Sequence, residues 1–133
     1  IKFWEFKKEV EENMALLDMD EKYLQRDLNC GFSGGEKKKA EVLQLLMLKP
    51  KIAILDETDS GLDVDAVKTV SKGIEAYRQK VGGALLVITH STKILSALTV
   101  DKTHVLVKGS LVAEGDASLI DEINNNGFAK YEN

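Results

Sequence analysis

The chain has 133 residues, of which 44% are hydrophobic and 30% charged, and its formal net charge is −4. This length fits one domain with its own core, and the acidic balance argues against general attraction to DNA, RNA or anionic lipid. Cys30 is the single cysteine in the sequence, so it cannot form an internal disulfide or hold a zinc or iron–sulfur centre alone.

The first third of the chain is predicted to be helical. Apolar residues at three- and four-residue steps predict a helix over residues 3–18, followed by a short helix over 21–28 and a turn at 30–31. A third helix is expected from Ser33 to about residue 48, where Pro50 ends it. The apolar side of this third helix is predicted to consist of Ala40, Leu43, Leu46 and Met47.

Two continuous apolar runs, residues 52–55 and 84–89, predict strands covered on both faces. An amphipathic helix is expected between them, ending at Gly82. A brief helix over 94–98, a hairpin over 104–115 and a polar helix over 116–126 complete the chain. This order predicts an α/β fold around a mainly parallel sheet. The apolar positions of the amphipathic helix are Val67, Val70, Ile74 and Tyr77.

Three features of the sequence bear on the compartment of the chain and on whether it is part of a longer protein. No apolar run approaches the ~20 residues that span a bilayer, and a lone thiol fits a reducing compartment such as the cytoplasm or an organelle stroma. The chain opens with Ile1 in a segment that looks like the middle of a helix. We therefore expect it to be a piece of a longer protein.

The stretch "FSGGEKKK" suggests an anion site at a helix start. Ser33 and Glu36 have the spacing of a capping box, which would be a purely structural role. Gly34 and Gly35 add something that a cap does not require, because glycines weaken a helix yet let backbone amides approach a ligand closely. A helix start of this kind suits phosphate, through its amides and the helix dipole.

The stretch "IAILDE" places two acids at the end of a strand. A carboxylate at this point is a frequent ligand of Mg²⁺, which predicts this role for Asp56. Glu57 would then orient and polarise an attacking water. The alternative is that the two acids simply begin a solvated loop, and for an isolated acidic pair that alternative is the more common.

Two further motifs follow. Residues 59–63 form an acidic turn before the next helix, in which Asp63 could be no more than an N-cap. His90 follows the second strand, at the sheet edge where Asp56 is expected, and could sense a γ-phosphate. A lone histidine at a strand end is more often structural than catalytic.

Taken in order, these motifs resemble the C-terminal half of an ABC-type ATPase. In that family "SGGE" would be the signature motif, "IAILDE" the Walker B strand, "SGLD" the D-loop and His90 the switch histidine. The resemblance implies a P-loop NTPase-like ABC ATPase domain. Residues 1–32 would end its helical subdomain, and residues 33–133 would form the C-terminal part of its core, with a terminal β-hairpin.

The resemblance also implies a mechanism, in which two ATP molecules are bound between two head-to-tail subunits. The signature motif of one subunit would cap the γ-phosphate bound by the other, and the D-loop would cross the seam between them. Asp56 would hold Mg²⁺, and Glu57 and His90 would be catalytic. The residues expected to contact the nucleotide are Ser33, Gly34, Gly35, Glu36 and Asp63.

Within the family, "GFSGGEKK", "DETDSGLD" and "DKTHVLVKGSLVAEGD" are similar to the SufC-type ATPases of iron–sulfur cluster assembly. This similarity implies SufB- and SufD-type scaffold proteins as partners, with no nucleic acid and no membrane insertion. The chain departs from the pattern at Lys39, where arginine is usual, and at "HSTKI", where an aromatic residue and basic residues are usual.

Three other hypotheses remain beside this one. The chain could belong to the ATPase subunit of an ABC transporter, although "ETDSGLD" speaks against it, or to the C-terminal lobe of an SMC- or Rad50-like chromosome protein. A non-enzymatic adaptor is disfavoured because the motif residues are intact. No G-x-x-x-x-G-K-[ST] loop occurs in the sequence, so we expect the fragment alone to bind ATP feebly and to be inactive.

Overall fold

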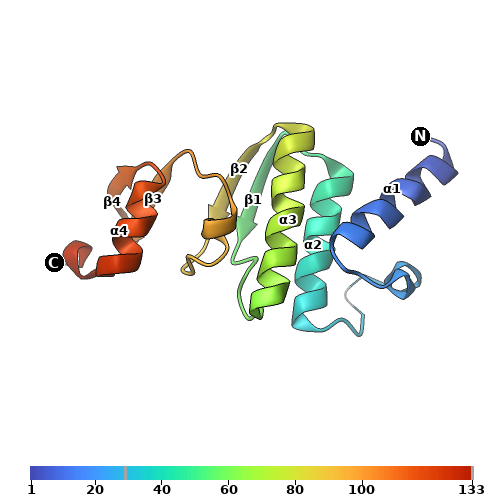
Figure 1. Cartoon of the computed structure of the whole chain (residues 1–133), viewed down its shortest axis with the longest axis horizontal. Coiled ribbons are helices and arrows are strands. Elements are labelled where there is room, and N and C mark those ends of the chain that lie inside the picture. The colour runs from blue at the N-terminus through green and yellow to red at the C-terminus, as the bar shows by residue number, and fades with distance from the viewer. Residues whose placement is uncertain (29, 133) are drawn as a thin grey trace. The chain divides into compact units, whose positions relative to one another are not determined.

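The computed structural model describes residues 1–28 and 30–132 (Figure 1), and the chain forms two compact units, Ile1–Ala97 and Leu98–Asn133. The domain boundary that we predict between residues 32 and 33 falls inside the first unit, and it stays a prediction. The predicted turn at 30–31 is present, with Gly31 at φ +68°.

The first unit alternates helices and strands as predicted, with two differences. The predicted helix over 21–28 is a shorter 3₁₀ helix, because this segment has no buried residue that would extend an apolar face. The brief helix expected over 94–98 is also a 3₁₀ turn. The elements are α1 (Phe3–Leu16), η1 (Glu21–Gln25), α2 (Gly34–Leu48), β1 (Ile52–Asp56), α3 (Val64–Val81), β2 (Ala84–Ile88) and η2 (Leu95–Ala97).

Strands β1 and β2 pair in parallel, with α3 as the crossover between them. The register runs from Ile52 opposite Ala84 to Asp56 opposite Ile88. Both strands therefore end at the same edge of the sheet, and the residues that follow them leave it side by side. This register places the predicted acidic pair beside the segment that carries His90.

Helices α2 and α3 lie against each other on one side of the two strands (Figure 1). All four predicted apolar positions of α3 are buried, and Gly82 ends the helix with φ +65°. The buried side of α2 differs from the prediction, since Leu43 and Met47 are only partly buried. The helix turns different apolar residues toward its neighbours, and its buried residues are Ala40, Val42, Leu45 and Leu46.

The prediction that both strands are covered on both faces is wrong for the residues that the structure describes. α2 and α3 cover one face only, so the apolar side chains that alternate onto the other face remain exposed. These side chains are Ile52 (70% exposed), Ile54 (63%), Leu86 (51%) and Ile88 (46%).

The second unit contains the predicted hairpin and polar helix. β3 (Thr103–Val107) and β4 (Ser110–Gly115) pair antiparallel, with an irregularity after Val105. Lys108 and Gly109 have φ of 50° and 80°, as a tight two-residue hairpin turn requires. α4 (Ser118–Asn126) follows, with Leu119 and Ile120 buried, and then the 3₁₀ turn η3 (Ala129–Tyr131).

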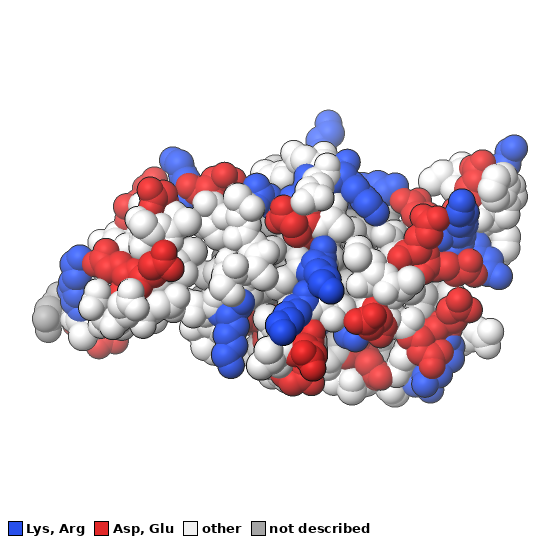
Figure 2. Space-filling view, viewed as in Figure 1, with Lys and Arg blue, Asp and Glu red and all other residues white. Residues whose placement is uncertain are grey.

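Charged side chains of both signs are interspersed on the face shown in Figure 2. Along α1, for example, Lys7 pairs with Glu11 at 3.5 Å and Lys8 with Glu12 at 3.8 Å. This face therefore presents no concentrated basic patch. In the described part of the chain, none of the helices combines the length and the apolar character needed to cross a membrane.

Candidate functional site

The candidate site begins where β1 and β2 end. The backbone amide of Glu57 continues the parallel pairing by donating to the carbonyl of Ile88 at 2.8 Å. Glu57 has φ 53°, a left-handed conformation that costs a residue with a side chain about 1–2 kcal/mol. The chain therefore turns sharply at the acid that the sequence predicts to be catalytic. Strained residues of this kind cluster at functional sites.

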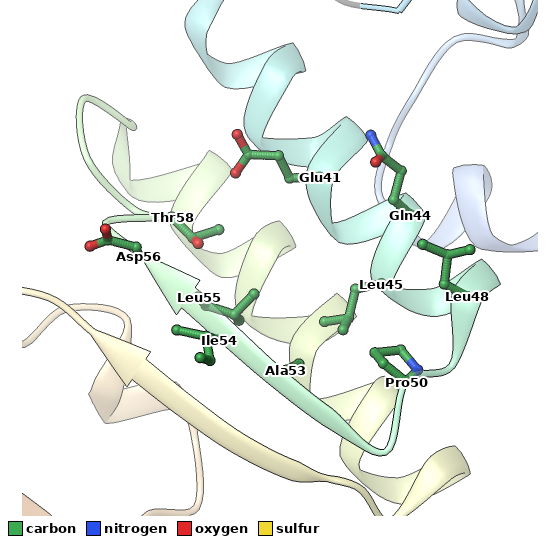
Figure 3. Close-up of a pocket in the computed structure, with 10 residues that line it drawn as sticks. All are labelled: Glu41, Gln44, Leu45, Leu48, Pro50, Ala53, Ile54, Leu55, Asp56 and Thr58. Carbon is green, nitrogen blue, oxygen red and sulfur yellow. The ribbon is translucent and has the colours of Figure 1, made fainter.

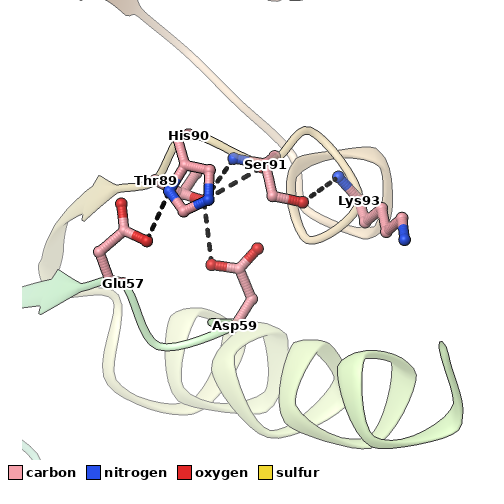
Figure 4. A network of polar contacts seen from close by, with 6 residues as sticks. All are labelled: Glu57, Asp59, Thr89, His90, Ser91 and Lys93. Atoms are coloured by element: carbon pink, nitrogen blue, oxygen red, sulfur yellow. Dashed lines mark hydrogen bonds and ion pairs between the residues drawn. The ribbon is translucent and has the colours of Figure 1, made fainter. Parts of the chain in front are cut away.

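Glu57 and His90 are in direct contact (Figure 4). Glu57 Oε2 lies 2.7 Å from His90 Nδ1, and His90 is largely exposed. The hydrogen bond from the imidazole to Glu57 raises the pKa of His90, the negative charge of Glu57 adds to it, and the charge of Asp59 raises it further by a smaller amount. A carboxylate and an imidazole paired in this way can hold and exchange a proton beside a bound substrate.

Asp56 ends β1 at an exposed position, beside a groove of about 340 Å³ that runs between α2 and β1 (Figure 3). No cluster of three or more His, Cys, Asp or Glu side chains that could hold a metal occurs among the described residues. Magnesium needs no such cluster, because it is bound by one or two carboxylates together with substrate phosphates and water. A single exposed carboxylate such as Asp56 is compatible with this mode of binding, and its role as a magnesium ligand stays a prediction.

The turn after β1 connects the strand to α3. Asp59 is buried, with 6% of its surface exposed, and its Oδ1 accepts a hydrogen bond from Thr89 Oγ1 at 2.9 Å. Asp63 caps α3 by accepting from the amide of Ala66 at 2.8 Å. The N-cap interpretation of Asp63 is thus confirmed, and a nucleotide contact by the same residue stays a prediction.

Ser33 and Glu36 form the capping box at the start of α2. The Glu36 amide donates to Ser33 Oγ at 3.2 Å, and the Ser33 amide donates to Glu36 Oε2 at 2.7 Å. A methyl group placed at Gly34 would meet no atom within 4 Å, whereas one at Gly35 would lie 3.7 Å from Leu62 Cδ2. The glycine corner is therefore open on its outer side and touches the turn after β1 on its inner side.

Sequence comparisons show that this chain belongs to the ABC ATPase family. A family model described as "ABC transporter" matches residues 4–60. A probable ABC transporter ATP-binding protein of Streptococcus pyogenes is 51% identical, over 94% of this chain and 48% of the relative. The probable ATP-dependent transporter SufC of Escherichia coli is 42% identical, over 94% of this chain and 50% of SufC. The chain spans about half the length of these curated relatives.

Solved structures agree with the sequence comparisons. A nucleotide-free ATP-binding cassette from an ABC transporter matches with a TM-score of 0.70 at 21% identity, over 96% of this chain and 49% of that one. The chain has the fold of the C-terminal portion of an ABC ATPase domain. A solved structure of an SMC ATPase, whose dimerization is ATP-driven, matches less well. Its TM-score is 0.54 at 20% identity, over 77% of this chain and 64% of that one.

Two side chains in this ABC ATPase fold support the site but were not predicted from the sequence. Thr89 is the donor to Asp59 described above. The Tyr23 hydroxyl donates to Glu36, and its ring packs edge-on against Phe32 with centroids 4.8 Å apart. The bond from Tyr23, followed by that from the Ser33 amide, lowers the pKa of Glu36, and the bond to Glu36 raises the pKa of Tyr23. A tyrosine ten residues before a capping serine carries no sequence signal of this contact.

Proposed function

We propose that this chain is part of an ABC-type ATPase that hydrolyses ATP between two head-to-tail subunits. The observation that carries the proposal is the 2.7 Å contact between Glu57 Oε2 and His90 Nδ1 at the shared end of β1 and β2. It supports the predicted division of roles, in which Glu57 polarises the attacking water and His90 interacts with the γ-phosphate. Asp56, one residue earlier, would hold the magnesium ion that neutralises the phosphates.

The start of α2 would act on a second subunit. Ser33 and Gly34 are exposed, and the backbone N–H groups at this helix start can donate hydrogen bonds to an anion. In a head-to-tail dimer this corner would cover the γ-phosphate bound by the partner. The mechanism therefore requires two subunits, and the phosphate-binding loop that each needs would lie outside these 133 residues.

We propose further that the ATPase drives iron–sulfur cluster assembly on SufB- and SufD-type scaffold proteins. The support is the similarity to SufC, at 42% identity, together with the phrases "GFSGGEKK" and "DETDSGLD" in this sequence. The second candidate is the ATP-binding subunit of an ABC transporter, which the name of the relative at 51% identity favours. Binding of purified SufB- and SufD-type proteins, compared with binding of a transporter membrane subunit from the same genome, separates the two.

Glu57→Gln in the full-length protein tests the ATPase proposal. The amide keeps the size of the side chain but cannot act as a base, so ATP hydrolysis should fall by about 100-fold or more. ATP-dependent dimerization should persist and become longer-lived, because the bound ATP is no longer consumed. Gel filtration with ATP and a phosphate-release assay measure the two properties.

Glu12→Gln is the matched control, since Glu12 is an exposed residue of α1 whose contact is an i,i+4 pair with Lys8. It should leave both properties unchanged. Unchanged hydrolysis in Glu57→Gln, with a monomer in the presence of ATP, would show that Glu57 is not the catalytic group.

A further inference from the structure

The buried side chain of Asp59 is linked to the loop that carries His90 (Figure 4). Asp59 Oδ1 accepts from Thr89 Oγ1 at 2.9 Å, and the amide of Ser91 donates to the same Thr89 oxygen at 2.9 Å. Thr89 Oγ1 also lies 3.2 Å from the carbonyl of Ser91. A hydroxyl has one proton to donate, and the shorter contact favours Asp59. Thr89 is therefore bonded to the Asp59 carboxylate directly, and Ser91 is linked to it through the Thr89 hydroxyl.

The turn itself does not need this carboxylate. The amide of Ser60 donates to the carbonyl of Glu57 at 3.1 Å, and the amide of Leu62 donates to the carbonyl of Asp59 at 3.3 Å. Asp63 then caps the following helix. The backbone and this cap already close the turn, so the side chain of Asp59 is available for another task.

Burying an acid here is costly for the fold. Asp59 is 6% exposed, and its Oδ2 has no hydrogen-bond partner among the described residues. Buried carboxylates lose their hydration and are rare unless each oxygen is bonded. A smaller neutral side chain would fill a purely structural position at lower cost. Among the described residues, the one hydrogen bond of the Asp59 side chain is the bond from Thr89, and this bond is therefore the feature that needs an explanation.

We propose that Asp59 and Thr89 form a clamp that positions His90 against Glu57 and couples the turn after β1 to the loop after β2. This inference rests on the proposed ATPase function. Both are positioning residues in this proposal, because they would act on His90 through the backbone on either side of it. The clamp fixes the backbone immediately before and after His90, and the exposed imidazole is then held at its 2.7 Å distance from Glu57. A displacement of the turn would be transmitted to His90 through this bond.

Thr89→Val and Thr89→Ser form the matched pair that tests the clamp in the full-length protein. Valine removes the hydroxyl, whereas serine keeps it. We expect Thr89→Val to lower kcat for ATP about 10-fold with KM changed less than about twofold, as for other residues that orient a catalytic group. Thr89→Ser should retain most of the wild-type kcat. The Ser91 amide should exchange with solvent at least about tenfold faster in the valine variant only.

Asp59→Ala should reproduce the kinetic effect of Thr89→Val, and the double variant should lose no more kcat than either single variant, because the two residues act as a unit. Unchanged exchange of the Ser91 amide in Thr89→Val would overturn the clamp. So would additive losses in the double variant, or a raised KM with unchanged kcat. Amide exchange needs no ATP turnover, so a full-length protein without ATPase activity would refute the proposed function while the exchange data still decide whether the clamp exists.

Discussion

Gly34→Ala separates the requirements of the fold from those of the proposed phosphate contact. Gly34 is the first residue of α2 and its φ is not positive, so alanine can adopt its conformation. A methyl group there would meet no atom within 4 Å. Because alanine favours the helix and restricts the unfolded chain, the free energy of unfolding should stay unchanged or rise by up to about 1 kcal/mol.

The same substitution should impair function in the full-length protein. If the Gly34 amide approaches a phosphate on the partner subunit, the added methyl lies on the open outer side of the corner and obstructs that approach. A loss of about 1.4 kcal/mol in transition-state binding corresponds to tenfold in rate, and we expect at least this loss in ATP turnover. Phosphate release, ATP-dependent dimerization and urea unfolding measure the three properties on one preparation.

Gly73→Ala is the opposite control. A methyl group at Gly73 would lie 2.6 Å from Val42 Cγ1 and 2.7 Å from Leu17 Cδ2, inside the packed core between the helices. Overpacking of this kind costs about 1–3 kcal/mol of stability, while turnover per folded molecule should be preserved. The reasoning fails if Gly34→Ala destabilises the protein, because the glycine would then serve the fold. It also fails if turnover and dimerization of Gly34→Ala equal those of the wild type.

Two further predictions concern the same unit. The ring of Tyr77 is fully buried, and its hydroxyl donates to the carbonyl of Pro50 at 2.5 Å. Tyr77→Phe removes this hydroxyl, so the free energy of unfolding in urea should fall by about 1–3 kcal/mol. A smaller loss would show that water replaces the hydrogen bond. The pKa of His90 is raised by Glu57, so its NMR titration should have a midpoint above the ordinary value of about 6.5 and Glu57→Gln should lower that midpoint. Because the pKa is raised in the folded state, this pair stabilises the fold fully below about pH 6.5, and the stabilisation is lost as the pH rises through the folded pKa. A difference in unfolding free energy between the wild type and Glu57→Gln that grows at high pH would contradict the assignment.

Much of the fold could be predicted because local patterns determine it. The four apolar positions of α3 recur at helical spacing and are buried together, and the Lys108-Gly109 pair predicts its own hairpin turn. The buried side of α2 could not be predicted in the same way, since "VLQLLML" offers several apolar stripes. Packing against α3 determines which apolar residues of α2 are buried. Val42 is fully buried, and it approaches the backbone of α3 at Gly73, where there is no side chain.

The uncovered face of the sheet shows a different limit of sequence patterns. A continuous apolar run indicates that both faces of a strand avoid water, but it does not say what covers each face. In the structure α2 and α3 cover one face, and Ile54 and Leu86 remain on the other. The pattern describes the environment for which the strand is suited, and within the first unit α2 and α3 supply it on one face.

The candidate site was predicted in outline and not in its supporting contacts. The order of the acidic pair, the turn and His90 along the chain placed them at one sheet edge, because parallel strands end together. The bond between Asp59 and Thr89 joins residues thirty positions apart. It depends on the register of β1 against β2 and on the burial of Asp59, and neither can be obtained from residue types alone.

The two adjacent acids differ because of the strand that presents them. Alternation places Ile52, Ile54 and Asp56 on one face of β1, with Ala53 turned toward the helices. Asp56 thus keeps the direction of the strand and is exposed, as the magnesium contact proposed for it requires. Glu57 leaves the strand with φ 53° and turns to His90 instead. A one-residue shift in the pairing of β1 would turn each side chain of the strand to the opposite face. The different directions of Asp56 and Glu57 therefore depend on the register of β1 and on the left-handed conformation of Glu57.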